Sequence, residues 1–222
     1  MEASATPETG GRDLHVGRWA IAVLAAGFIA LLVYGLTTQG HDDRIDKALA
    51  SGRSIEAPGF TLEVLDRGTL PPRLEGPVGG VLGQDRLALS DLRGTPVVLN
   101  LWASWCTTCR EEADRLQKGW RSFGPRGVLF LGLDIEDLRG DARTFARRHG
   151  LTYPSVRDAG RSTSNRYGAT GIPETFFIDS SGRVVGHVIG VATDAQLRDG
   201  AVAARTGRIV GSSTGGDAIK VR

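Results

Sequence analysis

The sequence predicts an α/β fold in which a mixed central sheet is flanked by helices, preceded by one N-terminal transmembrane helix. Three observations lead to this expectation. Strand-like apolar runs alternate with helical patterns, two strand-like runs near the end are joined by a short turn, and an uncharged apolar segment lies near the N-terminus. The 222 residues, 41% of them hydrophobic, suffice for one soluble domain with additional segments at both ends.

The uncharged segment predicts a membrane anchor. Residues 19–40 carry no charged side chain, and their apolar stretch is long enough to cross a bilayer as a helix. A cleaved signal peptide is the alternative. Its apolar core usually has about 7 to 15 residues and is followed closely by an Ala-x-Ala pattern, whereas Thr-Thr-Gln-Gly follows here at residues 37–40. We therefore expect residues 1–18 to form a polar tail and residues 19–40 an uncleaved anchor.

The folded domain is expected to span residues 57–206. Short apolar runs predict its strands at residues 60–65, 96–102, 127–133, 174–179 and 184–189, the last two joined by a turn at residues 180–182. A helical pattern begins at the cysteines, and two further helices are predicted at residues 141–149 and 194–205. Strands that alternate with helices and end in a hairpin indicate a sheet of mixed strand directions.

Three segments have no regular pattern of their own. Residues 41–56 are expected to be a charged spacer with one possible helical turn. The Pro/Gly-rich residues 68–84 show no clear period, so we assign them no role. The Gly/Ser-rich residues 207–222 are expected to be a disordered C-terminal tail.

The helix after the cysteines shows a clear apolar stripe. Its members, spaced four, three, four and three residues apart, are Cys109, Ala113, Leu116, Trp120 and Phe123. Residues at this spacing share one helix face, which is expected to pack against the core. Cys109 is therefore predicted to point inward, whereas Cys106, at the tip of the helix, is predicted to be the reachable thiol.

Cys106 and Cys109 are the only cysteines, and they form a CxxC pair at the start of that helix. Unpaired backbone N–H groups and the positive end of the helix dipole both favour thiolate over thiol at this place. We predict that Cys106 is the nucleophile and that Cys109 resolves the mixed disulfide. A lowered pKa mainly makes Cys106 a better leaving group, because intrinsic nucleophilicity falls as the pKa falls.

Other uses of a CxxC pair fit less well. A zinc site would need a second CxxC or a pair of histidines, and the four histidines are scattered along the chain. Covalent haem attachment would need a histidine after Cys109, where Arg110 stands. A structural disulfide across so short a loop would contribute little stability. We therefore predict a redox-active disulfide with no metal and no cofactor.

At this point the chain resembles the thioredoxin superfamily, and within it the membrane-anchored TlpA/ResA/DsbE-type thiol–disulfide oxidoreductases. The resemblance covers roughly residues 56–205, and the motifs occur in the family's order. It rests on the Ala-Pro-Gly-Phe-Thr-Leu opening at residues 57–62, the approach to the CxxC at residues 89–106, the Gly-Ile-Pro-Glu-Thr-Phe-Phe-Ile-Asp segment at residues 171–179, and the single N-terminal anchor.

The resemblance implies a thioredoxin-like fold and further site residues. Pro173 matches the family's cis-proline, which would place the backbone of Ile172 beside the disulfide, where a substrate strand can pair. An ordinary proline that opens an edge strand is the alternative. Trp105 is expected to pack at the active site and to shield the cysteines, so it is grouped with Ile172 and Pro173 as substrate-binding.

Glu112 is the third predicted catalytic residue. It lies three residues after Cys109 and borders the buried stripe, where low polarity would raise its pKa. Family members carry an acidic residue at this position, which the resemblance implies assists the buried thiol. Thioredoxin itself has a buried aspartate on the preceding strand, where this chain has Asn100, which does not titrate. A solvated helix glutamate is the alternative.

The expected function is an extracytoplasmic thiol–disulfide oxidoreductase that reduces cysteine pairs of secreted proteins. By resemblance, the substrate is the CxxCH of apocytochrome c during cytochrome c maturation, and a membrane thiol reductase supplies electrons. The protein is expected in the cell membrane as a single-pass protein with its catalytic domain outside the cytoplasm, because disulfides are managed there. Basic residues flank the anchor on both sides and do not decide its orientation.

Three alternatives remain. A disulfide-forming oxidant uses the same chemistry, but Thr107-Thr108 lacks the histidine associated with strongly oxidising members. A peroxiredoxin would need a Pro-x-x-x-Thr-x-x-Cys stretch, and a copper-binding thioredoxin-fold chaperone would need a CxxxC pair with a late histidine ligand. Neither pattern occurs. A net charge of +2 with interspersed signs gives no basic stripe, so no nucleic-acid partner is expected.

Overall fold

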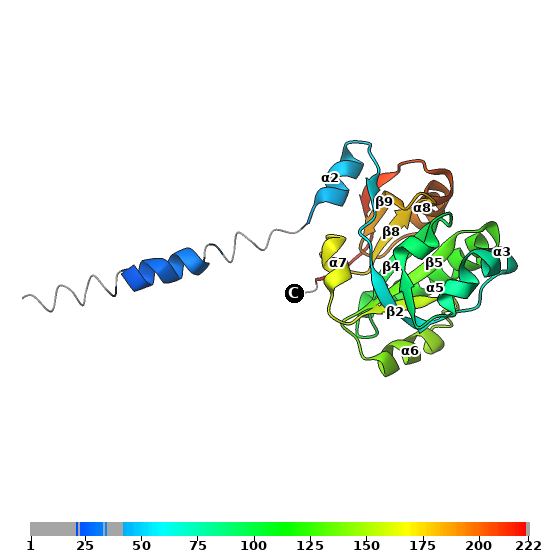
Figure 1. Cartoon of the computed structure of the whole chain (residues 1–222), viewed down its shortest axis with the longest axis horizontal. Helices are drawn as coiled ribbons and strands as arrows, with labels where there is room; N and C mark the ends of the chain where they lie inside the picture. Colours follow the sequence, from blue (N-terminus) through cyan, green and yellow to red (C-terminus); the bar gives the residue numbers. More distant parts are fainter. Residues whose placement is uncertain (1–20, 22, 33, 35–41, 221–222) are drawn as a thin grey trace, which may run out of the picture. The chain divides into compact units, whose positions relative to one another are not determined.

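The structure of the protein is a computed structural model that describes residues 21, 23–32, 34 and 42–220 (Figure 1). The chain divides into two units, residues 1–40 and 41–222. In the first unit the described residues are helical, and their large apolar side chains are 51–74% exposed. Among the residues described, no helix has both the length and the apolar character that a membrane crossing requires. The predicted tail and much of the predicted anchor lie outside the described residues.

The second unit contains a mixed nine-stranded sheet, which confirms the predicted α/β architecture. The strand order is β1-β9-β8-β4-β5-β6-β2-β3, and β10 pairs with β9. The pairs β4–β5, β5–β6 and β9–β10 are parallel, and the remaining pairs in the sheet are antiparallel. A second, two-stranded sheet joins β7 and β11. Figure 1 shows β4, β5 and β8 near the centre of the domain.

The strands are β1 (Ile55–Glu56), β2 (Thr61–Asp66), β3 (Arg86–Ala88), β4 (Val97–Trp102), β5 (Leu129–Ile135), β6 (Ser155–Asp158), β7 (Gly171–Ile172), β8 (Glu174–Ile178), β9 (Arg183–Ile189), β10 (Gly211–Thr214) and β11 (Ile219–Lys220). The helices of this unit are α2 (Arg44–Ala50), α3 (Pro72–Leu74), α4 (Gly80–Leu82), α5 (Thr107–Phe123), α6 (Arg139–Arg148), α7 (Ser162–Arg166) and α8 (Asp194–Thr206). Short 3₁₀ turns occur at Leu89–Leu92 and Gly124–Arg126, and a π-helical turn at Glu75–Gly79.

The two central parallel strands form the middle of the core. Every residue of β4 and β5 is buried, which explains why their sequences are nearly continuous apolar runs rather than alternating ones. Helix α5 then packs on this core through the predicted stripe, all five members of which are buried. α5 begins five residues after the last residue of β4, so the cysteines lie at the carboxyl end of this central strand.

The domain begins earlier than the predicted boundary at residue 57. Residues 41–56 are not a spacer: they contain α2 and β1, Ile45 and Leu49 are buried in the core, and β1 pairs with β9. Ile45 and Leu49 are four residues apart and share one helix face, a pattern too short to stand out among the charged residues around it. In residues 68–84, Leu74, Val78 and Leu82 are similarly spaced and buried.

The prediction of a disordered tail at residues 207–222 is wrong for two of its segments. β10 pairs in parallel with β9, and β11 pairs antiparallel with β7. Small residues permit this close pairing: a Cβ at Gly186 would collide with Val210, and one at Gly190 would collide with the backbone of Gly216. The Gly/Ser-rich composition here serves tight backbone contact rather than disorder.

Close packing of α8 on β8 generates the first prediction. A Cβ at Gly200 would collide with the ring of Phe177, which is itself fully buried. Gly200→Ala should therefore lower the free energy of unfolding by about 1–3 kcal/mol, although alanine is the better helix former. Urea unfolding measures this change. The control is Gly140→Ala in α6, where a Cβ meets nothing within 4 Å, and it should be neutral or stabilising. Equal effects at both positions would contradict the packing argument.

Candidate active site

The two cysteines lie at the start of α5 and are joined by a disulfide bond. Cys106 is the residue before the first helical turn, and the backbone N–H of Cys109 donates a hydrogen bond of 3.0 Å to its Sγ. The Oγ1 atom of Thr108 lies 3.4 Å from the same sulfur. The start of the helix therefore favours a thiolate at Cys106 once the bond is reduced.

Both cysteines are buried in this disulfide-bonded state. The exposed fraction is 0% for Cys106 and 3% for Cys109. The inward position of Cys109 is confirmed, but the prediction that Cys106 is reachable is wrong for the oxidised protein. The end of β7 lies against it: the carbonyl oxygen of Ile172 is 3.8 Å from the Sγ of Cys106. A partner can reach this sulfur only after a neighbouring group moves.

The Ile172–Pro173 peptide bond is cis, as predicted. Ile172 ends the short strand β7, and β8 begins directly after Pro173. β8 pairs with β4, with Glu174 opposite Leu101, so this turn lies at the same end of the sheet as the loop that leads to Cys106. Substrate binding by Ile172 and Pro173 stays a prediction.

Trp105 is the exposed aromatic residue beside the disulfide. Its side chain is 41% exposed, and its Nε1 donates a hydrogen bond of 3.0 Å to the carbonyl oxygen of Glu136. The ring is thus held at the surface, where an incoming polypeptide can contact it. Its predicted role in substrate binding is untested.

The loop after β5 fixes the residues that precede Cys106. The carboxylate of Asp137 accepts hydrogen bonds from the backbone N–H of Ser104 at 2.5 Å, from the Ser104 hydroxyl at 2.8 Å and from the backbone N–H of Leu138 at 2.7 Å. Sequence reasoning did not single out Asp137. The available signal was its place just after a buried strand that is parallel to β4, because such strand ends meet at one edge of the sheet.

Glu112 is fully buried, which excludes a solvated helix glutamate. Its Oε2 accepts a hydrogen bond of 3.0 Å from the side-chain amide of Asn100, and its Oε1 accepts one of 2.6 Å from the backbone N–H of Ala192. Burial raises the pKa of Glu112 to about 7, although these two hydrogen bonds oppose the change. Glu112 therefore gains or loses a proton near neutral pH on the same inward helix face as Cys109.

A second buried carboxyl group lies on β5. Burial, and then the charge of Asp137, raise the pKa of Asp134 to about 8, while Arg157, with its Nε 3.9 Å from an Asp134 oxygen, lowers it. Asp134 stands opposite Trp102, the last residue of β4, in the parallel pairing. At neutral pH this group is largely protonated, so it adds little negative charge close to the cysteine loop.

A series of hydrogen-bonded polar groups, in which Glu174 and His187 are buried and Asp46 is half-buried, holds the turn before Pro173. Oε1 of Glu174 accepts hydrogen bonds from the backbone N–H groups of Thr170 and Gly171, at 2.9 and 3.0 Å, and from the Thr170 hydroxyl. Oε2 of Glu174 lies 3.0 Å from Nε2 of His187, and Nδ1 of His187 lies 2.9 Å from Oδ1 of Asp46 on α2. The segment next to the disulfide is therefore connected to α2, 141 residues away from His187 in sequence.

The two carboxylates beside His187 favour its charged form. Burial alone would lower its pKa, but the hydrogen bonds and negative charges of Asp46 and Glu174 together raise it. A protonated imidazole donates from both ring nitrogens and so satisfies both carboxylates at once. Sequence reasoning noted the histidine only as a scattered one, because its partners are distant in the chain.

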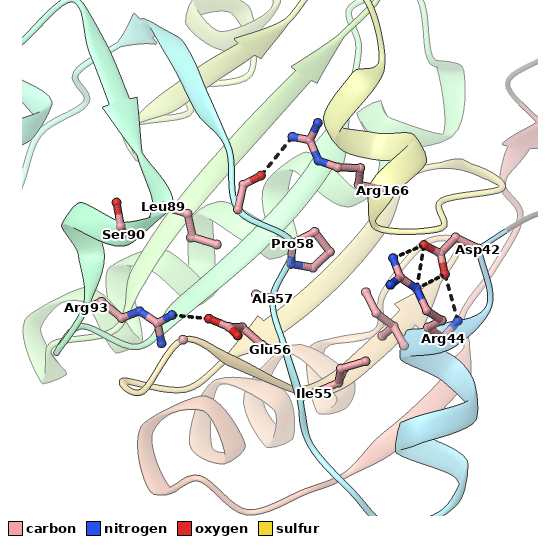
Figure 2. A pocket seen from close by; sticks show the side chains of 13 residues that line it. Asp42, Arg44, Ile55, Glu56, Ala57, Pro58, Leu89, Ser90, Arg93 and Arg166 are labelled. Carbon is pink, nitrogen blue, oxygen red and sulfur yellow. Dashed lines mark hydrogen bonds and ion pairs between the residues drawn. The ribbon is translucent and has the colours of Figure 1, made fainter.

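A separate hollow of about 590 Å³ lies beside β1 and the N-terminal end of α2 (Figure 2). Its arginines are already engaged: Arg44 contacts Asp42, Arg93 contacts Glu56, and Arg166 donates to the carbonyl oxygen of Gly59. Neither cysteine lines this hollow. We assign the active site to the disulfide and not to this pocket.

Comparison with known proteins agrees with the site. Residues 56–187 match the AhpC/TSA family. The thiol–disulfide oxidoreductase ResA of Bacillus thuringiensis (strain Al Hakam) is 32% identical over 112 residues, which cover 50% of this chain and 65% of that protein. The thiol:disulfide interchange protein DsbE of Pseudomonas fluorescens biotype C is 33% identical over 142 residues, 61% of this chain and 78% of that protein. The chain therefore spans just under two thirds of this ResA relative.

Solved structures confirm the predicted thioredoxin-like fold. A putative thiol:disulfide interchange protein DsbE from Chlorobium tepidum is 25% identical with a TM-score of 0.55, covering 68% of this chain and 96% of that one. A secreted thiol-disulfide isomerase from Corynebacterium glutamicum is 26% identical with a TM-score of 0.55, covering 68% and 86%.

The raised pKa of Glu112 predicts how stability depends on pH. The folded protein holds this proton more tightly than the unfolded chain, whose value is 4.5, so stability falls as pH rises from about 4.5 to 7, by about 3 kcal/mol. Glu112→Gln removes this contribution. The wild type should therefore lose about 3 kcal/mol of unfolding free energy between pH 4.5 and 8 that the variant does not lose. Urea unfolding of the oxidised proteins measures this. Glu111→Gln, on the exposed face, should follow wild type at every pH.

The hydrogen bonds that link Asp46, His187 and Glu174 generate the next prediction. Asp46→Asn removes one of the two charges that raise the pKa of His187, so that pKa should fall. Below about pH 6.5, where the protonated imidazole stabilises the fold, the variant should lose about 1–3 kcal/mol of stability, and the loss should shrink as pH rises through the folded-state pKa. NMR titration of the imidazole measures the pKa. Asp43→Asn, which breaks only the exposed pair with Lys47, is the control. An unchanged His187 titration in Asp46→Asn would contradict the assignment.

Proposed function

The chain belongs to the AhpC/TSA family and resembles its ResA- and DsbE-type thiol–disulfide oxidoreductases, and we propose that it exchanges the Cys106–Cys109 disulfide with cysteine pairs of other proteins. The observation that carries this proposal is the disulfide at the start of α5, with Ile172 beside it. Without the Pro-x-x-x-Thr-x-x-Cys stretch before either cysteine, a peroxidase reaction is the less favoured use of the pair.

Because the two cysteines differ in position, each performs a different step when the chain reduces a partner. The Cys106 thiolate attacks a partner disulfide, forms a mixed disulfide and releases one partner thiolate. The thiolate of Cys109 then attacks the Sγ of Cys106, breaks the mixed disulfide and releases the second partner thiolate. Two electrons pass to the partner, and the chain ends with the Cys106–Cys109 bond. The reverse sequence oxidises a partner.

Glu112 is suited to accept a proton from Cys109 and to donate one to it. Burial disfavours the Cys109 thiolate, so a base is needed when this thiol attacks and an acid when it is released. A carboxyl group with a pKa of about 7 serves in both directions at neutral pH. Glu112→Gln should therefore slow the step that Cys109 performs more than the first attack by Cys106.

We further propose that the chain acts as a reductant of secreted proteins, with the CxxCH of apocytochrome c as substrate and a membrane thiol reductase as electron donor. The Thr107-Thr108 pair between the cysteines supports the reducing direction over the oxidising one. The equilibrium reduction potential decides between them. A value near or below about −270 mV supports a reductant, whereas one near −120 mV supports the oxidant alternative.

The proposed location is the membrane, with the catalytic domain on the extracytoplasmic side. The uncharged residues 19–40 support an anchor, as do the exposed apolar side chains of the described helix within them. Protease added outside spheroplasts should digest the domain while cytoplasmic proteins stay intact. A domain that is protected until the membrane is lysed would contradict this orientation.

Trapping of mixed disulfides tests the proposed exchange. In Cys109→Ala the resolving thiol is missing, so partners should stay covalently bound to Cys106, whereas Cys106→Ala should trap none. Non-reducing gel electrophoresis followed by mass spectrometry identifies the partners. Cytochromes with a CxxCH motif among them would support the favoured substrate. If only disulfide-rich secreted proteins are trapped, the oxidant alternative gains support, and equal trapping by both variants would contradict the assigned roles.

A further inference from the structure

Residues 219–220, which form β11, pair with the strand beside the disulfide. β11 pairs antiparallel with β7, with Ile219 opposite Ile172 and Lys220 opposite Gly171. Ile172 is the residue whose carbonyl oxygen lies 3.8 Å from the Sγ of Cys106. The chain's own C-terminal segment, residues 217–220, therefore occupies the edge next to the reactive sulfur. We call this segment the C-terminal strap.

The strap is held in a defined place. A Cβ at residue 171 would lie 2.7 Å from the carbonyl oxygen of Ile219, so the glycine found there permits this close approach. The Ile219 side chain packs against the core. Just upstream, the backbone N–H of Gly215 donates to the carbonyl oxygen of Ile189 at 2.7 Å, and that of Gly216 to Val191 at 2.8 Å. β10 and these bonds anchor the segment that carries the strap to β7.

The strap and a protein partner need the same edge. Thiol–disulfide exchange requires a partner sulfur to reach the Sγ of Cys106, which is fully buried in the oxidised protein. The carbonyl oxygen of Ile172 lies 3.8 Å from this sulfur, so a polypeptide that brings its cysteine here along β7 can pair with the edge of that strand, because a short edge strand binds an extended chain by adding a strand. The strap already makes that pairing.

We propose that the C-terminal strap is the resting occupant of the partner-binding edge, and that an extended segment of a partner protein displaces it before exchange at Cys106. This inference rests on the proposed function, since it names the access step of the same site. A ladder of two residues is short, so the strap opens readily. We expect so short a pairing to favour the closed state over the open one by roughly 5- to 30-fold, and the apparent affinity for a partner to fall by the same factor.

Truncation tests the strap directly. A chain that ends at Gly216 lacks the strap, and in the reduced state it should reduce a disulfide-bonded test peptide with a KM lower by roughly 5- to 30-fold and an unchanged kcat. A chain that ends at Lys220 keeps β11 and is the matched control, with the KM of the full chain. Ile219→Asp in the full-length chain should lower the KM as the truncation does, because a charge at this packed position loosens the strap without shortening the chain.

A binding measurement needs no enzymatic activity. The synthetic hexapeptide of residues 217–222, Asp-Ala-Ile-Lys-Val-Arg, should bind the oxidised chain that ends at Gly216 at millimolar concentration and should not bind the full chain. Added to the truncated enzyme, it should raise the KM back toward that of the full chain. If the truncated and full chains bind it equally and have the same KM, the strap is not an occupant of this edge. If no chain reduces any test disulfide, the proposed function fails, while the binding result still decides the strap.

Discussion

The antiparallel pairing of β4 with β8 is the interaction on which the rest of the site depends. Five residue pairs, from Val97 opposite Ile178 to Leu101 opposite Glu174, fix the register of these two buried strands. This register places the end of β4, which leads to Cys106, beside the start of β8, which follows Pro173. A shift of one residue would turn every side chain of β8 to the other face, so the disulfide and the turn beside it are positioned by the core itself.

The same region concentrates buried ionisable groups, and their pKa changes share one direction. Burial raises the pKa of Glu112 to about 7, and burial with the charge of Asp137 raises that of Asp134 to about 8. The partners of His187 raise its pKa against the effect of burial. In each case the folded state binds the proton more tightly than the unfolded chain, so each contribution is lost as pH rises from the unfolded-state pKa through the folded-state pKa: from about 4.5 to 7 for Glu112, from about 3.8 to 8 for Asp134, and above 6.5 for His187. Perturbed pKa values are typical of functional sites, which agrees with the assignment of the active site to this region.

Sequence patterns predicted what is local and periodic. The stripe from Cys109 to Phe123 and the apolar runs of β4 and β5 located the helix, the central strands and the inward position of Glu112. They did not reveal the bond between His187 and Asp46, because residues 141 positions apart meet only in the folded sheet. β10 and β11 were missed for a different reason. A Gly/Ser-rich composition is typical of disordered segments, but small residues also permit close backbone pairing. Only the neighbouring strands show which of the two applies.

The asymmetry between the cysteines follows from one hydrogen bond. The backbone N–H of Cys109 donates to the Sγ of Cys106, so the backbone of the inner cysteine stabilises negative charge on the outer one. Cys109 itself lies deeper on the helix face, where burial disfavours its own thiolate. When a partner thiolate attacks Cys106, the bond breaks and the charge appears on Cys109, the less favoured place. In the mechanism proposed above, a protonated Glu112 on the same face supplies the proton that removes this charge, and the carboxylate it leaves keeps its hydrogen bonds from Asn100 and Ala192. In the proposed mechanism, opening of the disulfide is therefore coupled to proton transfer inside the core, and closing it runs the same transfer in reverse.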